Sequence, residues 1–537
     1  MNIKLSSWIA GLFFATLVLP ATATFAQDDR GDWPLTGADS GQSGWQKDES
    51  VLTPESAAAN FKFLWKIQLG KPGKEERAFS EPLLAGRLIN GQGFKDIVYW
   101  SSTDTLYAVD SELGSEIWTK QFSASGGKPA PGCGVSSLGV LMEPPVVINF
   151  RARARRAPGT PRPPVPPVLG PGERRLGVAP GGGYFGLKGI YVLTSDGMLH
   201  EQVMTTGVDF APPVKFLPAA NGGAYGINFA DKTIYTATGR GCGGIPNGVW
   251  AIDLSSADYA VNSYATPNVR PLALSGPALM SDGTSIFVTG AGNSDAKDET
   301  HPGSVVSLTK ELKVQDWYTP SAAMASYENV SPLTFTYKEK QYVVAPGSNG
   351  SVALLDAASL GGADHKTPLF ETSPLSNPGE KHVWDGFATW QEKNGTEKSE
   401  TERNGTVWVF ASVSSGMTLN GSNVQSHGPA SHGGLVAFRL DDTDGKLALN
   451  PVWVSQDMVN PAPPRVANGV VVALSGGDTS THAALYVLNA STGAELYSSK
   501  DQIPTYTELS GVSVGDGHAF FTDHDNVLYS FGIGLEH

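Results

Sequence analysis

Cysteine and long apolar runs are both scarce in this sequence, and each scarcity limits what the chain can be. Only two cysteines occur among the 537 residues, and no Cys-x-x-Cys-His motif is present, so we expect no covalent haem. After the first 26 residues, no segment approaches the roughly 20 consecutive apolar residues that a membrane-spanning helix needs. We therefore expect no transmembrane segment in the mature chain.

Basic residues are also outnumbered. The chain has 38 Lys and Arg against 52 Asp and Glu, which gives a formal net charge of −14. Phosphate contacts require clustered Lys and Arg, so we do not expect nucleic acid to be a partner. Charged residues make up only 17% of the chain, whereas there are 63 glycines and 37 prolines. This composition favours many short strands joined by turns over long helices.

The first 26 residues have the order of features of a secretory signal peptide. Lys4 supplies a short positive region, residues 8–19 are mostly apolar, and small residues precede a cleavage position after Ala26. We therefore expect the mature chain to be free in the periplasm or secreted.

A β-rich run, a turn and then an aromatic residue recur along the mature chain. Each copy follows two further strand-like runs, and Asn-Gly or Asp-Gly pairs, which accept the positive φ of tight hairpins, lie between or beside them. Four antiparallel strands per unit predict an all-β fold, an eight-bladed β-propeller. The eight copies, of which the second is degenerate, cover residues 105–118, 198–203, 248–254, 304–317, 351–357, 434–453, 484–497 and 527–531.

The ends of the mature chain predict how the ring closes. The last unit, residues 509–531, lacks an outer strand, and residues 61–69 supply one that carries an aromatic residue, Trp65, in the same style. We expect this N-terminal strand to complete the last blade. The predicted organisation is a signal peptide over residues 1–26, a lead-in over 27–60 and one eight-bladed propeller over 61–537.

Two motifs carry a resemblance to a known family. Residues 106–118, Leu-Tyr-Ala-Val-Asp-x-x-x-Gly-x-x-x-Trp, resemble the repeat of pyrroloquinoline-quinone propellers, the quinoprotein alcohol dehydrogenase-like family, in which the tryptophan packs between neighbouring blades. Residues 33–45, Trp-Pro-Leu-Thr-Gly-Ala-Asp-x-x-x-Ser-Gly-Trp, are similar to the lead-in of that family. The resemblance covers essentially the whole mature chain. It implies the fold more strongly than the chemistry, because such propellers include both enzymes and binding scaffolds.

The blade register places most of the unusual polar residues on one face, where the first strand of each blade starts and the second strand ends. We call this the top face, and its central opening, the top mouth, is the default binding site. Carboxylate and amide oxygens there could coordinate calcium, for which Glu143 and Asn293 are the candidates, and Trp384 could stack on a flat ligand. Ordinary hydrogen bonds within loops, and packing, remain the alternative. The predicted ligand-binding residues are Glu81, Glu143, Arg240, Asn247, Asn293 and Trp384.

The cysteines distinguish this chain from many quinone-dependent alcohol dehydrogenases, in which two adjacent cysteines form a ring over the cofactor. Here Cys133 and Cys242 lie apart, and each stands between two glycines. In an oxidising compartment the pair is a candidate disulfide, with two free thiols as the alternative.

Residues 151–180 differ from the rest of the chain, because they combine seven arginines with many prolines. The register inserts this segment in blade 2, between its first and second strands, on the face opposite the mouth. A solvated, disordered loop is one interpretation. The other is a docking arm for an anionic surface or polymer.

Two hypotheses for the function remain. The first is a scaffold that binds a small molecule or a protein at the top mouth, because the repeats are well kept while recognisable catalytic parts are not. The second is a dehydrogenase that uses pyrroloquinoline quinone with calcium to oxidise an alcohol or a sugar. In that mechanism Asp385 or Asp295 takes the proton of the substrate hydroxyl. Hydrolysis is disfavoured, because no nucleophile has a visible base partner.

Overall fold

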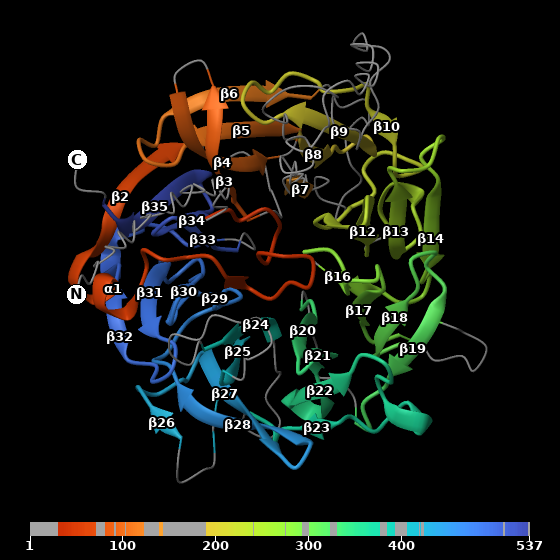
Figure 1. Cartoon of the computed structure of the whole chain (residues 1–537), viewed down its shortest axis with the longest axis vertical. Coiled ribbons are helices and arrows are strands. Elements are labelled where there is room, and N and C mark those ends of the chain that lie inside the picture. Colours follow the sequence, from red (N-terminus) through yellow and green to blue (C-terminus); the bar gives the residue numbers. More distant parts are fainter. Residues whose placement is uncertain are drawn as a thin grey trace, which may run out of the picture.

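Eight small sheets surround a central axis in the computed structural model (Figure 1). The one α-helix of the described residues, α1 (Pro54–Asn60), contacts the outer strands of the last two blades. The predicted all-β, eight-bladed propeller is therefore confirmed. The structure describes residues 31–70, 81–90, 93–102, 104–122, 139–142, 189–239, 241–273, 275–292, 300–322, 330–375, 384–392, 405–417, 419, 424–507 and 511–534.

In the first four blades the strands follow chain order from the axis outward. Blade 1 contains β3 (Leu83–Asn90), β4 (Gly93–Ser102), β5 (Thr105–Asp110) and β6 (Glu116–Gln121). Blade 2 contains β7 (Gly139–Met142), β8 (Gly189–Leu193), β9 (Met198–Val203) and β10 (Val214–Lys215). Blade 3 contains β11 (Asn228–Ala230), β12 (Thr233–Thr238), β13 (Gly248–Asp253) and β14 (Val261–Ala265). Blade 4 contains β15 (Pro271–Leu272), β16 (Ala278–Leu279), β17 (Ser285–Thr289), β18 (Val305–Leu308) and β19 (Val314–Tyr318).

The other four blades repeat this order, with two strands supplied from elsewhere in the chain. Blade 5 contains β20 (Leu333–Tyr337), β21 (Lys340–Pro346), β22 (Val352–Asp356) and β23 (Phe370–Glu371). Blade 6 contains β24 (Trp384–Gln391), β25 (Val407–Val413), β27 (Gly434–Thr443), β28 (Lys446–Val454) and the added β26 (Gln425–Ser426). Blade 7 contains β1 (Trp45–Gln46), β29 (Arg465–Ala467), β30 (Val470–Ser475), β31 (Ala484–Asn489) and β32 (Glu495–Ser498). Blade 8 contains β33 (Ser513–Gly515), β34 (His518–Thr522), β35 (Val527–Ile533) and β2 (Phe61–Gln68).

The ring closes as the sequence predicts. Strand β2 pairs antiparallel with β35, from Phe61 opposite Ile533 to Gln68 opposite Val527. The rings of Phe63 and Phe531 meet edge to face across this pair, with centroids 5.4 Å apart. Three sheets contain a fifth strand that the four-stranded prediction did not include. These are β1 in blade 7, β26 in blade 6, and the extra strand of blade 4, where the first strand is divided into β15 and β16. Each of these strands is only two residues long, so the sequence gives little signal for it.

Three tryptophans, Trp65, Trp118 and Trp453, connect their blades to the next blade. Each indole Nε1 donates to a carbonyl oxygen in the third-to-fourth-strand turn of the next blade, and a glycine of that turn faces the ring. A Cβ on Gly207, for example, would lie 2.6 Å from the Trp118 ring, and its φ of +67° already favours glycine. Packing of the tryptophan between blades, expected from the resemblance, is therefore confirmed. The donor–acceptor pairs are Trp65–Ser111 at 2.8 Å, Trp118–Met204 at 3.0 Å and Trp453–Ala490 at 3.0 Å.

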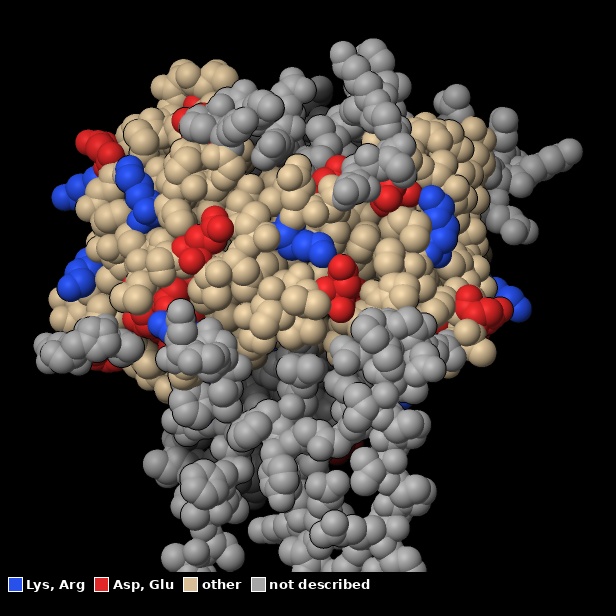
Figure 2. All heavy atoms as spheres, turned by 90° about the horizontal axis from the view of Figure 1, so that it is seen from above, with Lys and Arg blue, Asp and Glu red and all other residues tan. Residues whose placement is uncertain are grey.

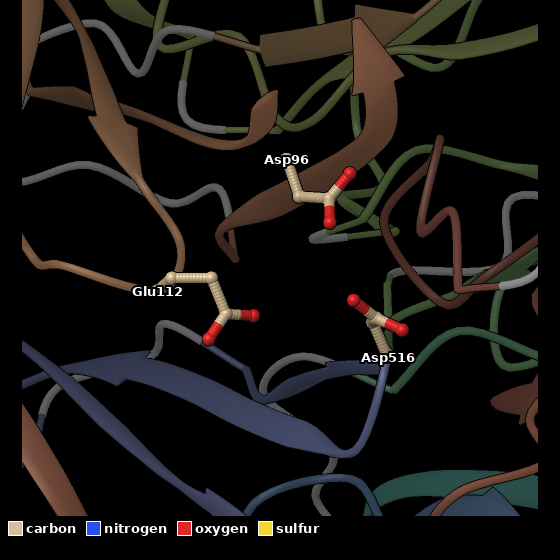
Figure 3. Close-up of side chains that lie close together, drawn as sticks. All are labelled: Asp96, Glu112 and Asp516. Carbon is tan, nitrogen blue, oxygen red and sulfur yellow. The ribbon is translucent and has the colours of Figure 1, made fainter. Parts of the chain in front are cut away.

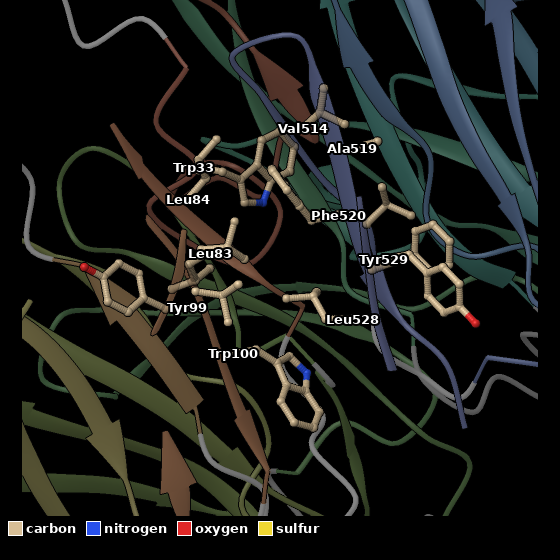
Figure 4. Close-up of a cluster of buried hydrophobic side chains, with 14 of the residues drawn as sticks. Trp33, Leu83, Leu84, Tyr99, Trp100, Val514, Ala519, Phe520, Leu528 and Tyr529 are labelled. Carbon is tan, nitrogen blue, oxygen red and sulfur yellow. The ribbon is translucent and has the colours of Figure 1, made fainter. Parts of the chain in front are cut away.

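The largest buried apolar cluster of the described residues runs from blade 7 through blades 8 and 1, where the two ends of the ring meet, into blade 2. Trp33, from the lead-in, is fully buried there beside Leu84 and Phe520 (Figure 4). Full burial of such large side chains stabilises the fold by about 2–3 kcal/mol each. The lead-in is therefore part of the propeller core.

Candidate functional site

Residues 31–46, which we call the channel segment, cross the centre of the ring (Figure 1). Trp33 exchanges two main-chain hydrogen bonds with Leu84 of blade 1. The segment then accepts hydrogen bonds from the innermost strands of blades 3 to 7. These strands are sheet edges with free N–H groups facing the axis, so the segment satisfies donors that would otherwise lack partners. The donor–acceptor pairs are Asn228 Nδ2–Ser40 O, Leu279 N–Ser40 O, Thr334 N–Gly41 O, Thr389 N–Ser43 O and Val466 N–Gly44 O, all at 2.8–2.9 Å.

The course of the channel segment follows from the strands it contacts. It begins at Gly31, against the β33–β34 turn on the bottom face, opposite the top mouth. It rises antiparallel to β3 and reaches Glu81, at the start of that strand, through Gly37. It then returns as β1, parallel to β29. The segment therefore runs through the channel from the bottom face, turns near Glu81 at the starting end of β3, and returns beside blade 7.

Glu81, a predicted ligand-binding residue, anchors the channel segment. Its carboxylate is only 1% exposed, and its Oε1 accepts hydrogen bonds from Trp33 Nε1, at 2.8 Å, and from Gly37 N. Its Oε2 accepts a hydrogen bond from Arg465 Nη2 at 2.5 Å. Arg465 is 3% exposed, and its Nε donates to Val512 O at 2.9 Å. Because both carboxylate oxygens are engaged by the chain, a ligand would have to displace one of these partners, and ligand binding by Glu81 stays a prediction.

Asn247 lies in the β12–β13 loop on the top face, as predicted. Its Oδ1 accepts a hydrogen bond from Gly241 N at 2.8 Å, and its Nδ2 donates to Val269 O at 3.4 Å. These bonds hold the loop that contains Cys242, whose side chain is fully buried. The other cysteine, Cys133, lies outside the described residues, so the disulfide stays a prediction.

The remaining predicted site residues are described only in part or not at all. Trp384 begins β24, the innermost strand of blade 6, as predicted, and Asp385 follows it, but their side chains lie outside the described part of the chain. Their ligand-binding and catalytic roles stay predictions. The same holds for the residues that lie entirely outside the described ranges, namely Glu143, Arg240, Asn293, Asp295 and residues 151–180.

The structure adds a cation to the top face that sequence reasoning missed. Arg270 directly precedes β15, and its Nε donates to the hydroxyl oxygen of Tyr225 at 3.0 Å. Tyr225 precedes β11, the innermost strand of blade 3, so this pair joins blades 3 and 4 at the starting end of their first strands. The signal available in the sequence was an arginine immediately before a predicted first strand.

Sequence reasoning also missed a cluster of carboxylates on the bottom face, formed by Asp96, Glu112 and Asp516. Burial and the neighbouring carboxylates raise the pKa of Asp516 from its ordinary 3.8 to about 7. In the sequence, Asp516 belongs to an Asp-Gly hairpin turn and Glu112 to the turn after the first repeat, so local spacing gives no reason to connect them.

The side of the ring that Figure 2 shows carries both basic and acidic residues. In Figure 2 basic and acidic residues alternate among uncharged ones, and the visible described surface has no continuous basic patch. The exclusion of nucleic acid stays a prediction. No helix in the described ranges is long and apolar enough to span a membrane.

The fold and the channel together define an eight-bladed propeller with its own N-terminal segment in the centre. No protein-family model and no curated protein sequence matches the chain. Among solved structures, it is similar to a quinohemoprotein alcohol dehydrogenase from Comamonas testosteroni, with 13% identity, a TM-score of 0.52, and coverage of 95% of this chain and 82% of that one. It is also similar to the quinohemoprotein alcohol dehydrogenase ADHIIG from Pseudomonas putida HK5, with 13% identity, a TM-score of 0.53, and coverage of 94% and 81%.

A third similar structure is a europium-containing methanol dehydrogenase, with 11% identity, a TM-score of 0.52, and coverage of 94% of this chain and 98% of that one. At such identities the likeness establishes the fold alone. At that level, the resemblance of the repeats to the quinoprotein propellers is confirmed.

Proposed function

We propose that this chain is an exported, quinoprotein-like propeller that binds a ligand or a protein partner at its top mouth. The observation that carries the proposal is the channel segment, which bonds to the innermost strands of six blades and runs through the channel from the bottom face. The top mouth is then the end of the channel left for a ligand. It is also the face that holds Asn247 and the Arg270–Tyr225 pair.

The described channel residues offer no uncommitted buried cation to pyrroloquinoline quinone, an anionic cofactor whose carboxylates need cations around them. Arg465 is the only buried arginine or lysine among the described residues. Its guanidinium already bonds to Glu81, Val512 and Pro464. We therefore derive no catalytic step through the quinone.

The alternative remains a dehydrogenase that uses the quinone with calcium. It is supported by the shared fold, because the similar structures include alcohol and methanol dehydrogenases. In that case Glu143, Asn293 and Asp295 or Asp385 would have to supply the cation ligands and the base.

A titration of the purified mature chain with the quinone and calcium separates the two functions. Quinone absorbance reports uptake, and dye reduction with a panel of alcohols and sugars reports turnover. We expect no dye reduction above that of the free quinone. Turnover that is lost in Asp385→Asn but kept in Asp444→Asn, an exposed turn residue, would contradict the proposal and support the dehydrogenase.

Export has its own test. N-terminal sequencing of the protein recovered from the periplasm or medium should read from Gln27, because the predicted cleavage follows Ala26. A protein that keeps Met1 and stays in the cytoplasm would contradict it.

A further inference from the structure

Three carboxylates meet on the bottom face where the first and last blades of the ring adjoin, and we call this group the seam triad (Figure 3). Asp96 lies on β4 and Glu112 in the turn after β5, both in blade 1, whereas Asp516 lies in the β33–β34 turn of blade 8. One carboxylate oxygen of each residue lies within 4.8 Å of those of the other two. The fold thus brings together acidic side chains from opposite ends of the chain.

The nearest other carboxylates are already compensated. Glu49 accepts hydrogen bonds from the main-chain N–H groups of Val51, Leu52 and Gly517 at 2.7–3.1 Å. Asp110 forms an ion pair with Lys95 at 2.7 Å. In the seam triad, Arg87 N donates a hydrogen bond to Asp96 Oδ1, but the three carboxylates also lie close to one another.

Two members of the seam triad have raised pKa values, as expected for carboxylates that repel one another. Burial raises the pKa of Asp516, and so do the charge of Asp96, a side-chain hydrogen bond with Asp96, and the charges of Glu49 and Glu112. Burial and the charges of Asp96 and Asp110 raise the pKa of Glu112. Each member is half-buried, so water screens the charges only in part.

A buried histidine gives independent evidence that the seam triad receives a ligand. His518 is 1% exposed, and its Nε2 lies 3.8 Å from Glu112 Oε1. Within the described residues, neither of these two buried atoms has a hydrogen-bond partner. Buried polar atoms in native proteins are rarely left unpaired, and an unpaired one often marks an ion or a water that belongs at the site.

We propose that Asp96, Glu112 and Asp516 bind one divalent cation of the calcium type, which joins blade 1 to blade 8. Calcium takes oxygen ligands at about 2.3–2.6 Å, so two oxygens on one ion lie up to about 5 Å apart. The oxygens of the seam triad all lie within 4.8 Å of one another, which is a separation that ligands of one calcium ion can have. Magnesium requires near-ideal octahedral geometry and loses its water reluctantly, so we expect it to bind this site more weakly.

His518 acts in this site as a positioning residue. Its Nε2 lies 3.8 Å from Glu112 Oε1, so a small movement of the Glu112 carboxylate on cation binding would bring the two within hydrogen-bond distance. Such a bond to a ligating carboxylate fixes its orientation. The other coordination positions of the cation are filled by water.

The cation would reinforce the closure of the ring. The turn that carries Glu112 also contains Ser111, whose carbonyl accepts the Trp65 Nε1 hydrogen bond from β2. Binding to the folded protein alone raises its stability by mass action. The site lies on the face opposite the top mouth, so it is independent of the proposed function.

Calorimetric titration of the EDTA-treated full mature chain with CaCl₂ tests the proposal, with MgCl₂ as the comparison. We expect one calcium site, at least tenfold tighter than magnesium, and a rise in Tm of ~3 °C at a hundredfold excess over Kd. Asp516→Asn should lose both effects.

The matched control is Asp444→Asn, which changes another Asp-Gly turn residue with a positive φ but lies far from the seam triad. It should bind calcium as the wild type does. Glu112→Gln provides a second loss-of-binding variant if Asp516→Asn folds poorly. Absence of calcium binding in the wild type, or equal binding by both Asp516→Asn and Glu112→Gln, would overturn the proposal.

Discussion

Acidic side chains are buried or partly buried at two places in the protein, and the two places differ in the partners of the carboxylates. In the channel, Glu81 is matched by one arginine and two N–H donors, so its charge holds the channel segment in place. In the seam triad, three carboxylates lie close together, and burial together with the neighbouring carboxylates raises the pKa of Asp516 to about 7. A buried charge with a counter-charge acts as a structural bond, whereas neighbouring carboxylates repel one another until one takes up a proton or, as we propose here, a cation binds.

We expect the largest loss of stability when the counter-charge of Glu81 is removed. Arg465→Met leaves the buried Glu81 carboxylate without its counter-charge, and removal of one partner from a buried pair costs about 3–5 kcal/mol. Urea unfolding should report this loss.

The double variant Glu81→Gln, Arg465→Met serves as the control. It leaves no uncompensated charge, so we expect it to recover much of the loss. If the single variant stays within about 1 kcal/mol of the wild type, the pair is not the anchor of the channel segment.

A second substitution tests how closely blade 1 and blade 8 pack beside the seam triad. A Cβ on Gly114 would lie 2.5 Å from the Trp65 ring, whereas a Cβ on Gly445 meets nothing within 4 Å, although both glycines have positive φ. Both alanine variants pay about 1 kcal/mol for the backbone, but Gly114→Ala should lose about 1–3 kcal/mol more from overpacking. Equal losses in thermal unfolding would show that the indole does not pack on this turn.

Much of the fold could be predicted from the sequence, because each blade repeats a local pattern of strands and turns. The closing strand could be predicted for the same reason, since residues 61–69 match the strand missing from the last unit. The course of the channel segment could not be predicted. Its bonds join main-chain atoms of Ser40, Gly41, Ser43 and Gly44 to residues hundreds of positions away, and such bonds leave no side-chain signature.

The candidate sites were harder to predict than the fold. Glu81 and Asn247 were placed correctly at the start of a first strand and in a top-face loop, but their bonding partners depend on tertiary contacts. The seam triad was missed, because Asp516 has an ordinary role in a hairpin turn and meets Asp96 only when the ring closes. Clusters of side chains that form only where the first and last blades meet therefore become visible only in the structure.

A smaller change in stability should follow when the repulsion among the carboxylates of the seam triad is reduced. In calcium-free protein at pH 8, Asp516→Asn removes one charge from the seam triad while Asn still accepts the positive φ of this turn. We expect stability to rise by about 1 kcal/mol, a value discounted because the side chain is half-exposed. Asp444→Asn should leave thermal unfolding unchanged. A destabilised Asp516→Asn protein would contradict the repulsion.

The smallest expected effect is the pH dependence of the difference in stability between Asp516→Asn and the wild type. The folded pKa of Asp516, about 7, lies above its ordinary value of 3.8, so its contribution to stability is fully present below pH 3.8 and is lost as the pH rises through 7. The advantage of Asp516→Asn over the wild type should therefore vanish near pH 4 and reach its full size above pH 7. Unfolding both proteins in EDTA across this range cancels the titration of groups that they share. A difference that is constant with pH would place its origin outside the carboxylate.

The cation site is tested most directly by anomalous scattering from a crystal soaked with a lanthanide that substitutes for calcium. The account predicts an anomalous peak at the bottom face, in contact with carboxylate oxygens of Asp96, Glu112 and Asp516 and not with His518. A well-ordered seam without a peak, or a peak at the top mouth alone, would contradict it.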